Sequence, residues 1–363
     1  MEYTFADVLE IKNGKSQKAV ENPDGKYPIY GSGGVMGYAD DYICEADTVI
    51  IGRKGSINNP IFVNEPFWNV DTAFGLQAKK ELLIPLYLYY FCKNFDFERL
   101  NKTVTIPSLT KSDLLKIKIT LPDITLQKSV IDRLTAIERV IEQRKIELEM
   151  LDKIVSARFV DMFGDPISNP KGWNMVELGE LTGIGSSKRI FEKEYVSEGI
   201  PFYRTKEIVE LSKGNSISTE LFITEERFAE IKEQYGVPQA GDLLISAVGT
   251  IGVIWIVDGK NDFYFKDGNL IRVDGSDAFD SVYMKNLLEH LISEYKKQMS
   301  SGTAYAALTI SGLTKMKVYD VPMNLQIQFS DFVKQVDKSK VAVQKSLDET
   351  QILFDSLMQE YFG

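Results

Sequence analysis

Two short segments of the chain combine cations, hydroxyls and glycines in a way that suits contact with a nucleic acid. The Gly-Arg-Lys-Gly segment at 52–55 puts two cations on a short turn, where they can reach a phosphate group or the acceptor edge of guanine. The Tyr-Arg-Thr-Lys segment at 203–206 adds an aromatic ring and a hydroxyl to two cations. For each residue taken alone, an ordinary solvated surface position is the competing interpretation, so the hypothesis depends on the group.

A wider set of polar, basic or glycine-rich loop residues between predicted strands completes this hypothesis. Reading DNA requires some side chains on base edges and others on phosphates. In the first half of the chain the candidates are Lys15, Ser32, Arg53, Lys54, Ser56, Lys102, Thr103, Thr105 and Ser108. In the second half they are Ser187, Lys188, Arg189, Tyr203, Arg204, Thr205, Lys206, Thr250, Thr303 and Tyr305.

Other kinds of chemistry find little support in the residues. The single histidine, His290, sits in a predicted helix without a cluster of cysteines or aspartates beside it, which favours a half-buried or surface side chain over a metal ligand. Cys44 and Cys92 are too few for a disulfide framework or a cysteine-rich metal site. No G-x-x-x-x-G-K-[ST] phosphate loop is present, and the glycines at 31–37 favour a tight turn over a nucleotide loop. We therefore expect no catalytic residue, no cofactor and no metal.

The charge balance counts against nucleic acid as a first guess. The net charge of the 363 residues is −10, whereas DNA-binding proteins usually carry a basic footprint. Residues 1–122 hold 14 basic and 15 acidic side chains, and residues 164–322 hold 17 and 23. Because the local field at the binding face is what matters, a DNA-facing surface must be a local cluster, or partner subunits must supply part of the phosphate contact.

The sequence gives no reason for the chain to leave the cytoplasm. No apolar run approaches the roughly 20 residues that span a bilayer. The stretch at 1–15 lacks the basic start and apolar segment of a secretion signal. We expect a cytoplasmic protein with no membrane partner.

An internal repeat organises the chain. The segment at 109–127 and the segment at 308–326 share leucines, lysines, a Leu-Thr pair and a Leu-Gln pair at a constant offset, which still holds at the Phe-Gly pairs 163–164 and 362–363. Upstream the match is looser, with 47–57 resembling 242–251. Further plausible counterparts are Asp71 with Asp267 and Tyr87 with Tyr283. Such self-similarity indicates two related halves.

Each half begins with a mixed region of short strands and helices. Short β-branched runs bounded by Gly, Asn, Pro and Asp predict strands, and longer segments of the same regions predict helices. The predicted strands are 47–52, 60–63, 243–247 and 251–257, and the predicted helices are 84–95 and 279–299.

Each half ends in a long predicted helix. Residues 123–163 contain no Gly or Pro, and a three-four spacing from Val130 to Met162 is mostly apolar, interrupted by Arg144 and Arg158. The segment 323–362 repeats the rhythm, with Lys340 and Thr350 as exceptions. This pattern predicts a coiled-coil seam, with helices about 60 Å long.

An amphipathic helix of this kind needs a partner for its apolar stripe, and three partners are open. Each helix could pack on its own globular region, or on a second copy of the chain, or on the other long helix. We favour the last, an antiparallel coiled coil, because the seam is long. The predicted fold is therefore α+β, with repeated mixed α/β domains at 1–122 and 164–322 and long helices at 123–163 and 323–363 as spacers. Antiparallel pairing puts the domains at opposite ends of the rod, around a pseudo-twofold axis.

At this point the residues resemble a known family, the specificity subunits of type I restriction–modification systems. The strings that carry the resemblance are YPIYGSGGVMGY at 27–38, DTVIIGRKGSI at 47–57, GDLLISAVGTIG at 241–252, LTKSDLLKIKITLP at 109–122, LTISGLTKMKVYDVP at 308–322, FGDP at 163–166 and PKGWNMVELGEL at 170–181. The resemblance extends over essentially the whole chain. One departure is local, since the family's Glu-Gln at the start of the long helix is Leu-Gln here, at 126–127 and 325–326.

The resemblance implies a function and a set of partners. It implies two target-recognition domains that read a bipartite, asymmetric site in double-stranded DNA. It also implies docking of methyltransferase subunits, two per chain, and of restriction/translocase subunits, which would carry out methylation and cleavage. The alternative from a different class is a coiled-coil scaffold whose repeated domains bind protein, which takes the acidic charge at face value.

Overall fold

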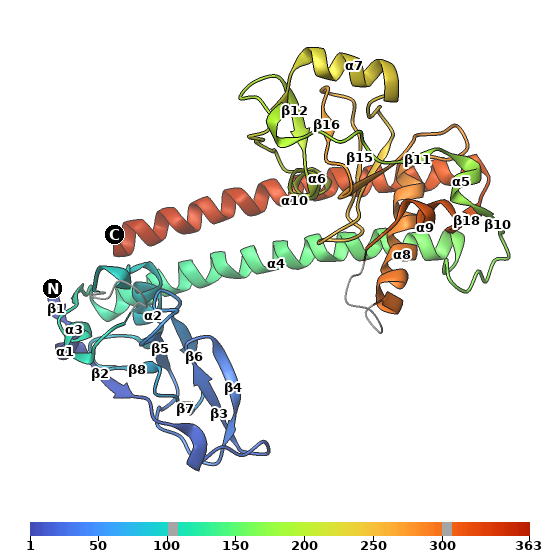
Figure 1. Cartoon of the computed structure of the whole chain (residues 1–363). Coiled ribbons are helices and arrows are strands. Elements are labelled where there is room, and N and C mark those ends of the chain that lie inside the picture. The colour runs from blue at the N-terminus through green and yellow to red at the C-terminus, as the bar shows by residue number, and fades with distance from the viewer. Residues whose placement is uncertain (101–107, 300–306) are drawn as a thin grey trace. The chain divides into compact units, whose positions relative to one another are not determined.

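The computed structural model of the chain describes residues 1–100, 108–299 and 307–363. These residues form two compact units, each of which combines a sheet region with parts of both long helices. Unit 1 consists of Met1–Glu147 and Val343–Gly363, and unit 2 consists of Leu148–Ala342. Figure 1 shows the elements of both units.

The first half of the chain runs from β1 to the long helix α4. Its elements are β1 (Glu2–Thr4), α1 (Phe5–Val8), β2 (Leu9–Asn13), η1 (Gln17–Ala19), β3 (Tyr27–Gly31), β4 (Gly34–Ala39), β5 (Thr48–Gly52), β6 (Ile61–Val63), β7 (Trp68–Asn69), β8 (Ala73–Ala78), α2 (Pro85–Asn94), η2 (Phe97–Leu100), α3 (Lys111–Leu114), β9 (Lys118–Thr120) and α4 (Ile124–Phe163).

The second half runs from β10 to the long helix α10. Its elements are β10 (Asn174–Glu177), α5 (Leu178–Leu181), β11 (Ile184–Gly185), η3 (Glu192–Glu194), β12 (Ile200–Tyr203), α6 (Thr205–Ser212), β13 (Phe222–Ile223), α7 (Glu225–Tyr235), β14 (Leu243–Ser246), β15 (Ile254–Ile256), β16 (Tyr264–Phe265), β17 (Leu270–Val273), α8 (Ser281–Met299), α9 (Ile310–Thr314), β18 (Lys317–Asp320) and α10 (Met323–Phe362).

The sheets of the two units have the same topology, which confirms the predicted repeat. Unit 1 has a four-stranded sheet in the order β2-β8-β5-β6 and a three-stranded sheet in the order β4-β3-β7. Unit 2 has the matching orders β11-β17-β14-β15 and β13-β12-β16. In both smaller sheets one pair is parallel, β3 with β7 and β12 with β16.

The central strand β5 explains why the four-stranded sheet forms at a β-branched run. All five residues of β5 are buried, because both faces of the strand are covered. Val49 and Ile51 join the core that includes α2, whereas Ile50 packs with Val63 and Phe67 on the opposite face. This alternation is the period of two that a strand imposes. A continuous apolar run is therefore the expected signature of such a strand.

The structure also corrects one detail of the repeat. Tyr87 and Tyr283 are equivalent, as predicted, since both are buried near the start of α2 and α8. Asp71 and Asp267 are not equivalent. Ala73 pairs with the last residue of β5 and Leu270 pairs with the last residue of β14, which puts Asp71 level with the residue after Asp267.

The predicted long helices are present, as α4 and α10, and within each unit parts of the two helices contact each other. In unit 1, Ile141 shares a core with Phe354 and Met358, and Arg133 donates a hydrogen bond of 3.1 Å to the Tyr361 hydroxyl. In unit 2, Phe159 and Val155 share a core with Phe329 and Val333. Lys340, a predicted exception to the seam, pairs with Asp152 at 2.6 Å. The same cores contain sheet residues, so each helix packs both on its sheet region and on the other helix.

Two buried glutamines tie the first turns of the long helices to their sheet regions. The Gln127 side chain accepts a hydrogen bond from the Ile84 backbone N–H and donates to the Leu82 and Pro122 carbonyls. Gln326 accepts from the Asp280 backbone N–H and donates to the Val321 carbonyl. These are the glutamines of the two repeated Leu-Gln pairs, so their recurrence has a structural cause.

None of the helices that the structure describes is long and apolar enough to cross a membrane.

Candidate nucleic-acid interface

The loop between β5 and β6 is held at the end of the four-stranded sheet of unit 1. The Arg53 backbone N–H donates to the Thr72 carbonyl at 2.7 Å, and the Arg53 carbonyl accepts from the Leu109 N–H at 3.0 Å. Lys54 forms an isolated β-bridge with Ser108. The backbone of the loop is thus fixed on both sides, which leaves its side chains to point outward.

Neighbouring loops bring other predicted residues to the same place. The Lys15 backbone N–H donates to the Asn69 carbonyl at 2.9 Å. A Cβ added to Gly52 would overlap the Ser56 carbonyl oxygen and lie 3.1 Å from the Ser32 Cβ, so the loops meet only because position 52 is a glycine. The structure therefore gathers all the described candidates of unit 1. They are Lys15, Ser32, Arg53, Lys54, Ser56 and Ser108.

This group in unit 1 is cationic. Lys15, Arg53 and Lys54 are exposed, and none of the three forms an ion pair within residues 1–100, 108–299 and 307–363. The Arg53 guanidinium lies 5.8 Å from the centre of the Phe74 ring, a distance at which a cation is attracted to the face of an aromatic ring. The side chain is therefore supported from one side, and its hydrogen-bond donors remain available.

Unit 2 repeats the backbone of this loop between β14 and β15. The Ala247 N–H donates to the Asn269 carbonyl at 2.8 Å, and the Ala247 carbonyl accepts from the Leu308 N–H at 3.0 Å. These are the same two contacts that Arg53 makes in unit 1, so Ala247 occupies the position of Arg53.

The turn that follows has the same conformation in both units. Gly55 has a φ of +77° and Gly249 a φ of +75°, a region that favours glycine. The Ile57 N–H bonds to the Gly55 carbonyl at 2.9 Å, and the Ile251 N–H bonds to the Gly249 carbonyl at 3.0 Å. The segments 53–56 and 247–250 are therefore equivalent loops with different side chains.

The loop of unit 2 borders a hollow at the end of its sheet. The hollow has a volume of about 320 Å³, and its apolar lining includes Ala247, Leu270, Ile271 and Leu308. Ser187 also lines it, and its hydroxyl oxygen is buried without a hydrogen-bond partner among the described residues. Unlike the cationic surface in unit 1, this part of unit 2 offers an apolar recess with a polar border.

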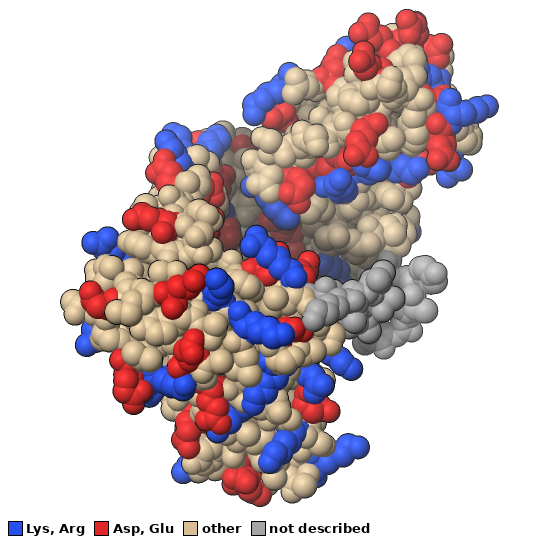
Figure 2. All heavy atoms as spheres, turned by 90° about the vertical axis from the view of Figure 1, so that its left-hand side faces the viewer, with Lys and Arg blue, Asp and Glu red and all other residues tan. Residues whose placement is uncertain are grey.

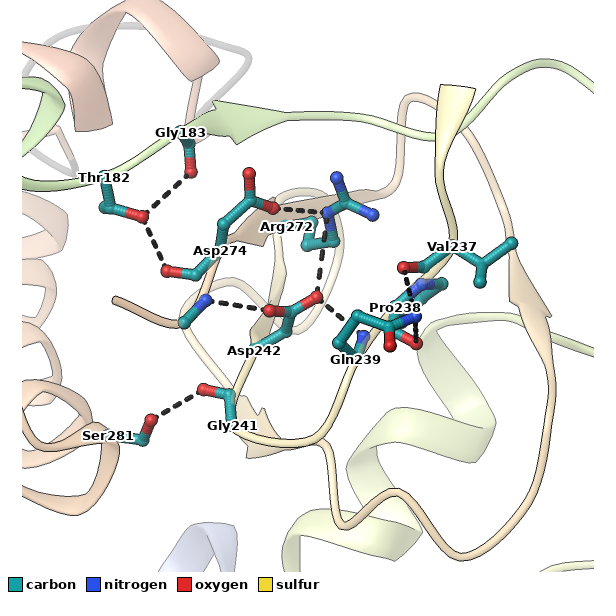
Figure 3. Close-up of polar contacts among 11 residues, drawn as sticks. Thr182, Gly183, Val237, Pro238, Gln239, Gly241, Asp242, Arg272, Asp274 and Ser281 are labelled. Carbon is teal, nitrogen blue, oxygen red and sulfur yellow. Dashed lines mark hydrogen bonds and ion pairs between the residues drawn. The ribbon is translucent and has the colours of Figure 1, made fainter. Parts of the chain in front are cut away.

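A carboxylate fixes the opposite end of β14, as Figure 3 shows. Asp242 accepts hydrogen bonds from the backbone N–H groups of Gln239 and Gly275, both at 2.8 Å. Arg272 lies 3.9 Å from Asp242 and forms a closer ion pair of 2.6 Å with Asp274. Anchoring the start of this strand gives the loop after it a rigid base.

The predicted Ser-Lys-Arg segment of unit 2 lies beside the turn before β17. The Lys188 N–H donates to the Tyr264 hydroxyl at 2.6 Å, and the Lys188 ammonium lies 5.1 Å from the centre of the Tyr235 ring. Arg189 pairs with Asp267 at 2.9 Å. The segment thus joins the border of the hollow, but its arginine is already neutralised by a carboxylate.

Within the predicted segment 203–206, the structure separates the tyrosine from the cations. Tyr203 is only 7% exposed, its ring stacks on Phe263 at 4.6 Å, and burial raises its pKa. Arg204 is half-buried and bonds Glu207 at 2.9 Å. Lys206 is exposed. We therefore leave Tyr203 out of the candidate interface and treat it as a core residue.

The remaining predictions divide in two. Thr250 is exposed on the loop equivalent to 53–56, and Thr205 is half-buried at the start of α6 with no partner for its hydroxyl among the described residues. Five candidates lie outside the described residues. They are Lys102, Thr103, Thr105, Thr303 and Tyr305.

Sequence reasoning missed the polar turns that support both loops. Thr72 and Asn269 carry the carbonyls that fix the loops, and both are exposed. Asn269 ends a Lys-Asp-Gly-Asn turn, and the Asp-Gly pair is a strong turn signal that could have found it. Thr72 follows no comparable signal, and only the pairing of strands reveals its role.

Charge outside these loops is mixed. Figure 2 shows acidic and basic side chains interleaved over the visible face of the molecule, in keeping with the net charge of −10. A single-sign field that would grip DNA by itself is absent from the described part of that face. Any phosphate contact made by this chain alone must come from local groups such as the loop at 53–56.

The single histidine has a structural environment. His290 lies on α8, its ring stacks on Phe159 with 5.1 Å between centres, and burial lowers its pKa. Its Nε2 lies 3.4 Å from the Ser156 hydroxyl. Among the described residues no group of three or more metal-ligating side chains comes together.

Comparison with known proteins gives a consistent result. A family model described as type I restriction modification DNA specificity domain matches residues 1–150 and 170–350. A putative type I restriction enzyme specificity subunit of Haemophilus influenzae is 27% identical over 331 residues, which is 88% of this chain and 83% of that protein. The MjaIX specificity subunit of Methanocaldococcus jannaschii is 29% identical over 196 residues, or 48% and 43% of the two chains.

Solved structures share the fold. A type I restriction–modification S subunit from M. genitalium superposes with a TM-score of 0.61 at 18% identity, covering 100% of this chain and 96% of that one. A structure described as explaining complex assembly and conformational transition of the type I R-M system gives a TM-score of 0.62 at 17% identity, covering 100% and 97%.

Proposed function

Since the chain belongs to the type I restriction modification DNA specificity domain family, we propose that it is the DNA-recognition subunit of a type I restriction–modification complex. The observation that carries the proposal is the duplicated sheet end, where each unit presents an equivalent loop on the same hydrogen-bonded frame. Recognition subunits are not the catalytic components of such complexes, so this chain contributes no reaction of its own, and it acts on DNA in the cytoplasm.

The target is bipartite and asymmetric. One frame repeated in two units supplies two readers, and each reader takes one half-site. The side chains on the two frames differ, with Arg53 and Lys54 in one loop and Ala247 and Val248 in the other. Because base edges are distinguished by donor, acceptor and methyl patterns, unlike side chains select unlike half-sites.

The long helices form an antiparallel coiled coil that separates the two target-recognition domains, 1–122 and 164–322. Contacts inside each unit support this arrangement. In unit 1 an early residue of α4, Arg133, meets a late residue of α10, Tyr361. In unit 2 a later residue of α4, Asp152, meets an earlier residue of α10, Lys340. Residue numbers that rise along one helix fall along the other, and the duplicated halves are related by a pseudo-twofold axis.

The partners are two methyltransferase subunits, with restriction/translocase subunits added to them. Both long helices leave apolar residues in solvent. Exposed examples are Met150, Ile154 and Val341 in unit 2 and Ile352 and Leu353 in unit 1. Docked subunits would cover such residues, and they would supply positive charge that this acidic chain lacks.

The test is DNA selection by the assembled complex. The full chain, alone and co-purified with methyltransferase subunits, is incubated with a pool of random duplexes at about 50 and 200 mM salt. We expect the complex to select one bipartite, asymmetric sequence with strongly salt-dependent affinity, and the isolated chain to bind weakly. The same sequence should appear at methylated adenines in the host genome. A complex that selects no sequence, while the chain still holds its protein partners, would support the protein-binding scaffold instead.

A further inference from the structure

The two equivalent loops carry different kinds of side chain, cationic in unit 1 and apolar in unit 2, and this difference bears on which bases they recognise. Unit 1 has Arg53 and Lys54 where unit 2 has Ala247 and Val248. Arg53 and Ala247 make the same two backbone contacts, and the turns at Gly55 and Gly249 have the same conformation, so the side chains differ on a shared backbone. Val248 is 45% exposed, so its apolar side chain is available for contact.

The strand residues beside the two loops also differ between the units. In unit 1, β8 places Phe74 opposite Ile51, and the Arg53 guanidinium lies over this ring. In unit 2, β17 places Ile271 opposite Ile245. Ala247 occupies the position of the arginine, and together with Ile271 it lines the hollow of about 320 Å³.

These two surfaces suit different groups in the major groove. Guanine presents two acceptors, N7 and O6, that an arginine contacts with two parallel hydrogen bonds. Thymine presents a methyl group that prefers an apolar surface. The hollow has an apolar part that includes Ala247, Leu308 and Ile310, and a border that includes Ser187 and Asp267. Val248 follows Ala247 in the chain and is exposed.

We propose that the loop at 53–56 reads a guanine through Arg53, whereas the loop at 247–250 reads a thymine through its methyl group. The inference rests on the proposed function and assigns base chemistry to it. Each half-site then contains a defined base pair beneath its loop, G·C in the half-site of unit 1 and A·T in that of unit 2.

Loop exchange tests the assignment in the assembled complex. R53A/K54V transfers the apolar pair to unit 1, and A247R/V248K transfers the cations to unit 2, with both glycines retained. We expect R53A/K54V to weaken selection of guanine at one position of its half-site by about 5- to 150-fold. The reciprocal variant should replace thymine by guanine. In both variants the other half-site and the spacer should be unchanged, and Lys118→Ala, at an exposed position of β9 that is not a candidate for DNA contact, should leave both half-sites as they are.

Removal of a methyl group tests the thymine directly. For the wild-type complex, duplexes that carry deoxyuridine in place of the thymine should bind about 3- to 10-fold more weakly than the thymine duplex. For the Val248→Ser complex, the deoxyuridine and thymine duplexes should bind with equal affinity. The inference is wrong if loop variants lower affinity for every sequence equally, or if uracil and thymine bind the wild type equally. These outcomes differ from failure of the proposed function, in which the wild-type complex selects no sequence.

Discussion

At the scale of single residues, Gln127 and Gln326 show how one side chain can determine where a long helix starts. Each glutamine is almost fully buried and bonds backbone groups of the segment before α2 or α8. Buried polar groups are tolerated only when hydrogen-bonded. The amide thus fixes the first turn of the long helix to the sheet region, which an apolar side chain could not do.

Replacing this amide should destabilise the protein. Gln127→Ala leaves the Ile84 backbone N–H without its acceptor, and an unsatisfied buried donor costs about 1–3 kcal/mol. Urea unfolding followed by circular dichroism measures the loss. Lys128→Ala, at the exposed neighbouring position, is the matched control and should change the free energy of unfolding by less than about 0.5 kcal/mol. Equal effects of the two changes would refute the anchoring role.

The ion pair of Glu207 should make stability depend on pH. Burial opposes ionisation of Glu207, but hydrogen bonds from the Arg204 side chain and backbone outweigh it and lower the pKa. A lowered pKa contributes stability above the unfolded value, about 4.3, and this contribution is lost as the pH falls through the folded value. Glu207→Gln should therefore unfold more easily than wild type at neutral pH, and the difference between the two should shrink as the pH falls below the unfolded value.

The measurement for Glu207 is urea unfolding at several pH values, with Glu198→Gln as control at an exposed position. The control should follow the wild-type curve throughout. A constant gap between Glu207→Gln and wild type from pH 7 to pH 3 would contradict the assignment.

The sequence predicted the cationic loop at 53–56 because glycines flank two adjacent cations. It did not predict the burial of Tyr203. That residue ends β12, and the rings that contact it come from segments far along the chain. Phe263 stacks on it and Trp255 meets it edge to face. A tyrosine beside cations in sequence looks like a surface residue unless the strand direction is known.

At the scale of elements, the sequence predicted where the long helices begin and end. It did not predict which face of each helix is most deeply buried. The three-four spacing from Val130 selects Val155 and Arg158, whereas the structure buries Phe159 and Phe163 completely. These rings pack on Tyr283 of α8 as well as on Phe329 of α10. A coiled-coil pattern describes contacts between two helices, and here the sheet region covers an additional face.

Phe159 provides a test of that additional contact. Phe159→Ala removes a ring that lies against Tyr283, His290 and Phe329, and such cavities cost about 3–5 kcal/mol. Val160→Ala, one position along and exposed, should cost less than about 1 kcal/mol. Differential scanning calorimetry of the two variants compares them. If Phe159→Ala lowers the stability no more than Val160→Ala does, the face of α4 that carries Phe159 is not part of the core.

The strands differ in how well sequence could find them. The central strands β5 and β14 are β-branched or leucine runs, and their predicted spans agree with Thr48–Gly52 and Leu243–Ser246. The strands β7, β11 and β16 have two residues each. Two residues cannot display a period of two, so their pairing depends on the loops around them and is invisible in the sequence.

At the scale of the whole molecule, the proposed coiled coil predicts a ruler for the target. Four residues inserted into both α4 and α10 should lengthen each helix by about 6 Å. At 3.4 Å per base pair, the spacer between the half-sites should grow by about two base pairs while the bases of both half-sites stay the same. Sequencing of methylated sites or selection from random duplexes reads both quantities.

The control for the ruler is an insertion of the same four residues at 213–216, an exposed stretch between α6 and β13. It should leave the spacer as it is. A spacer that stays constant after insertion into both helices would show that helix length does not set the distance between half-sites, even if the complex still recognises its bases.

The division of the chain into units has a consequence for synthesis on the ribosome. Unit 2 is one continuous stretch, Leu148–Ala342, whereas unit 1 joins Met1–Glu147 to Val343–Gly363. The core of unit 1 includes Phe354 and Met358, and Phe362 lies 5.0 Å from Tyr87. Although nascent domains generally fold in order from the N-terminus, the first part of this chain to be translated completes its core last. Apolar core residues of unit 1 therefore stay exposed, and accessible to chaperones, until the final turns of α10 have left the exit tunnel.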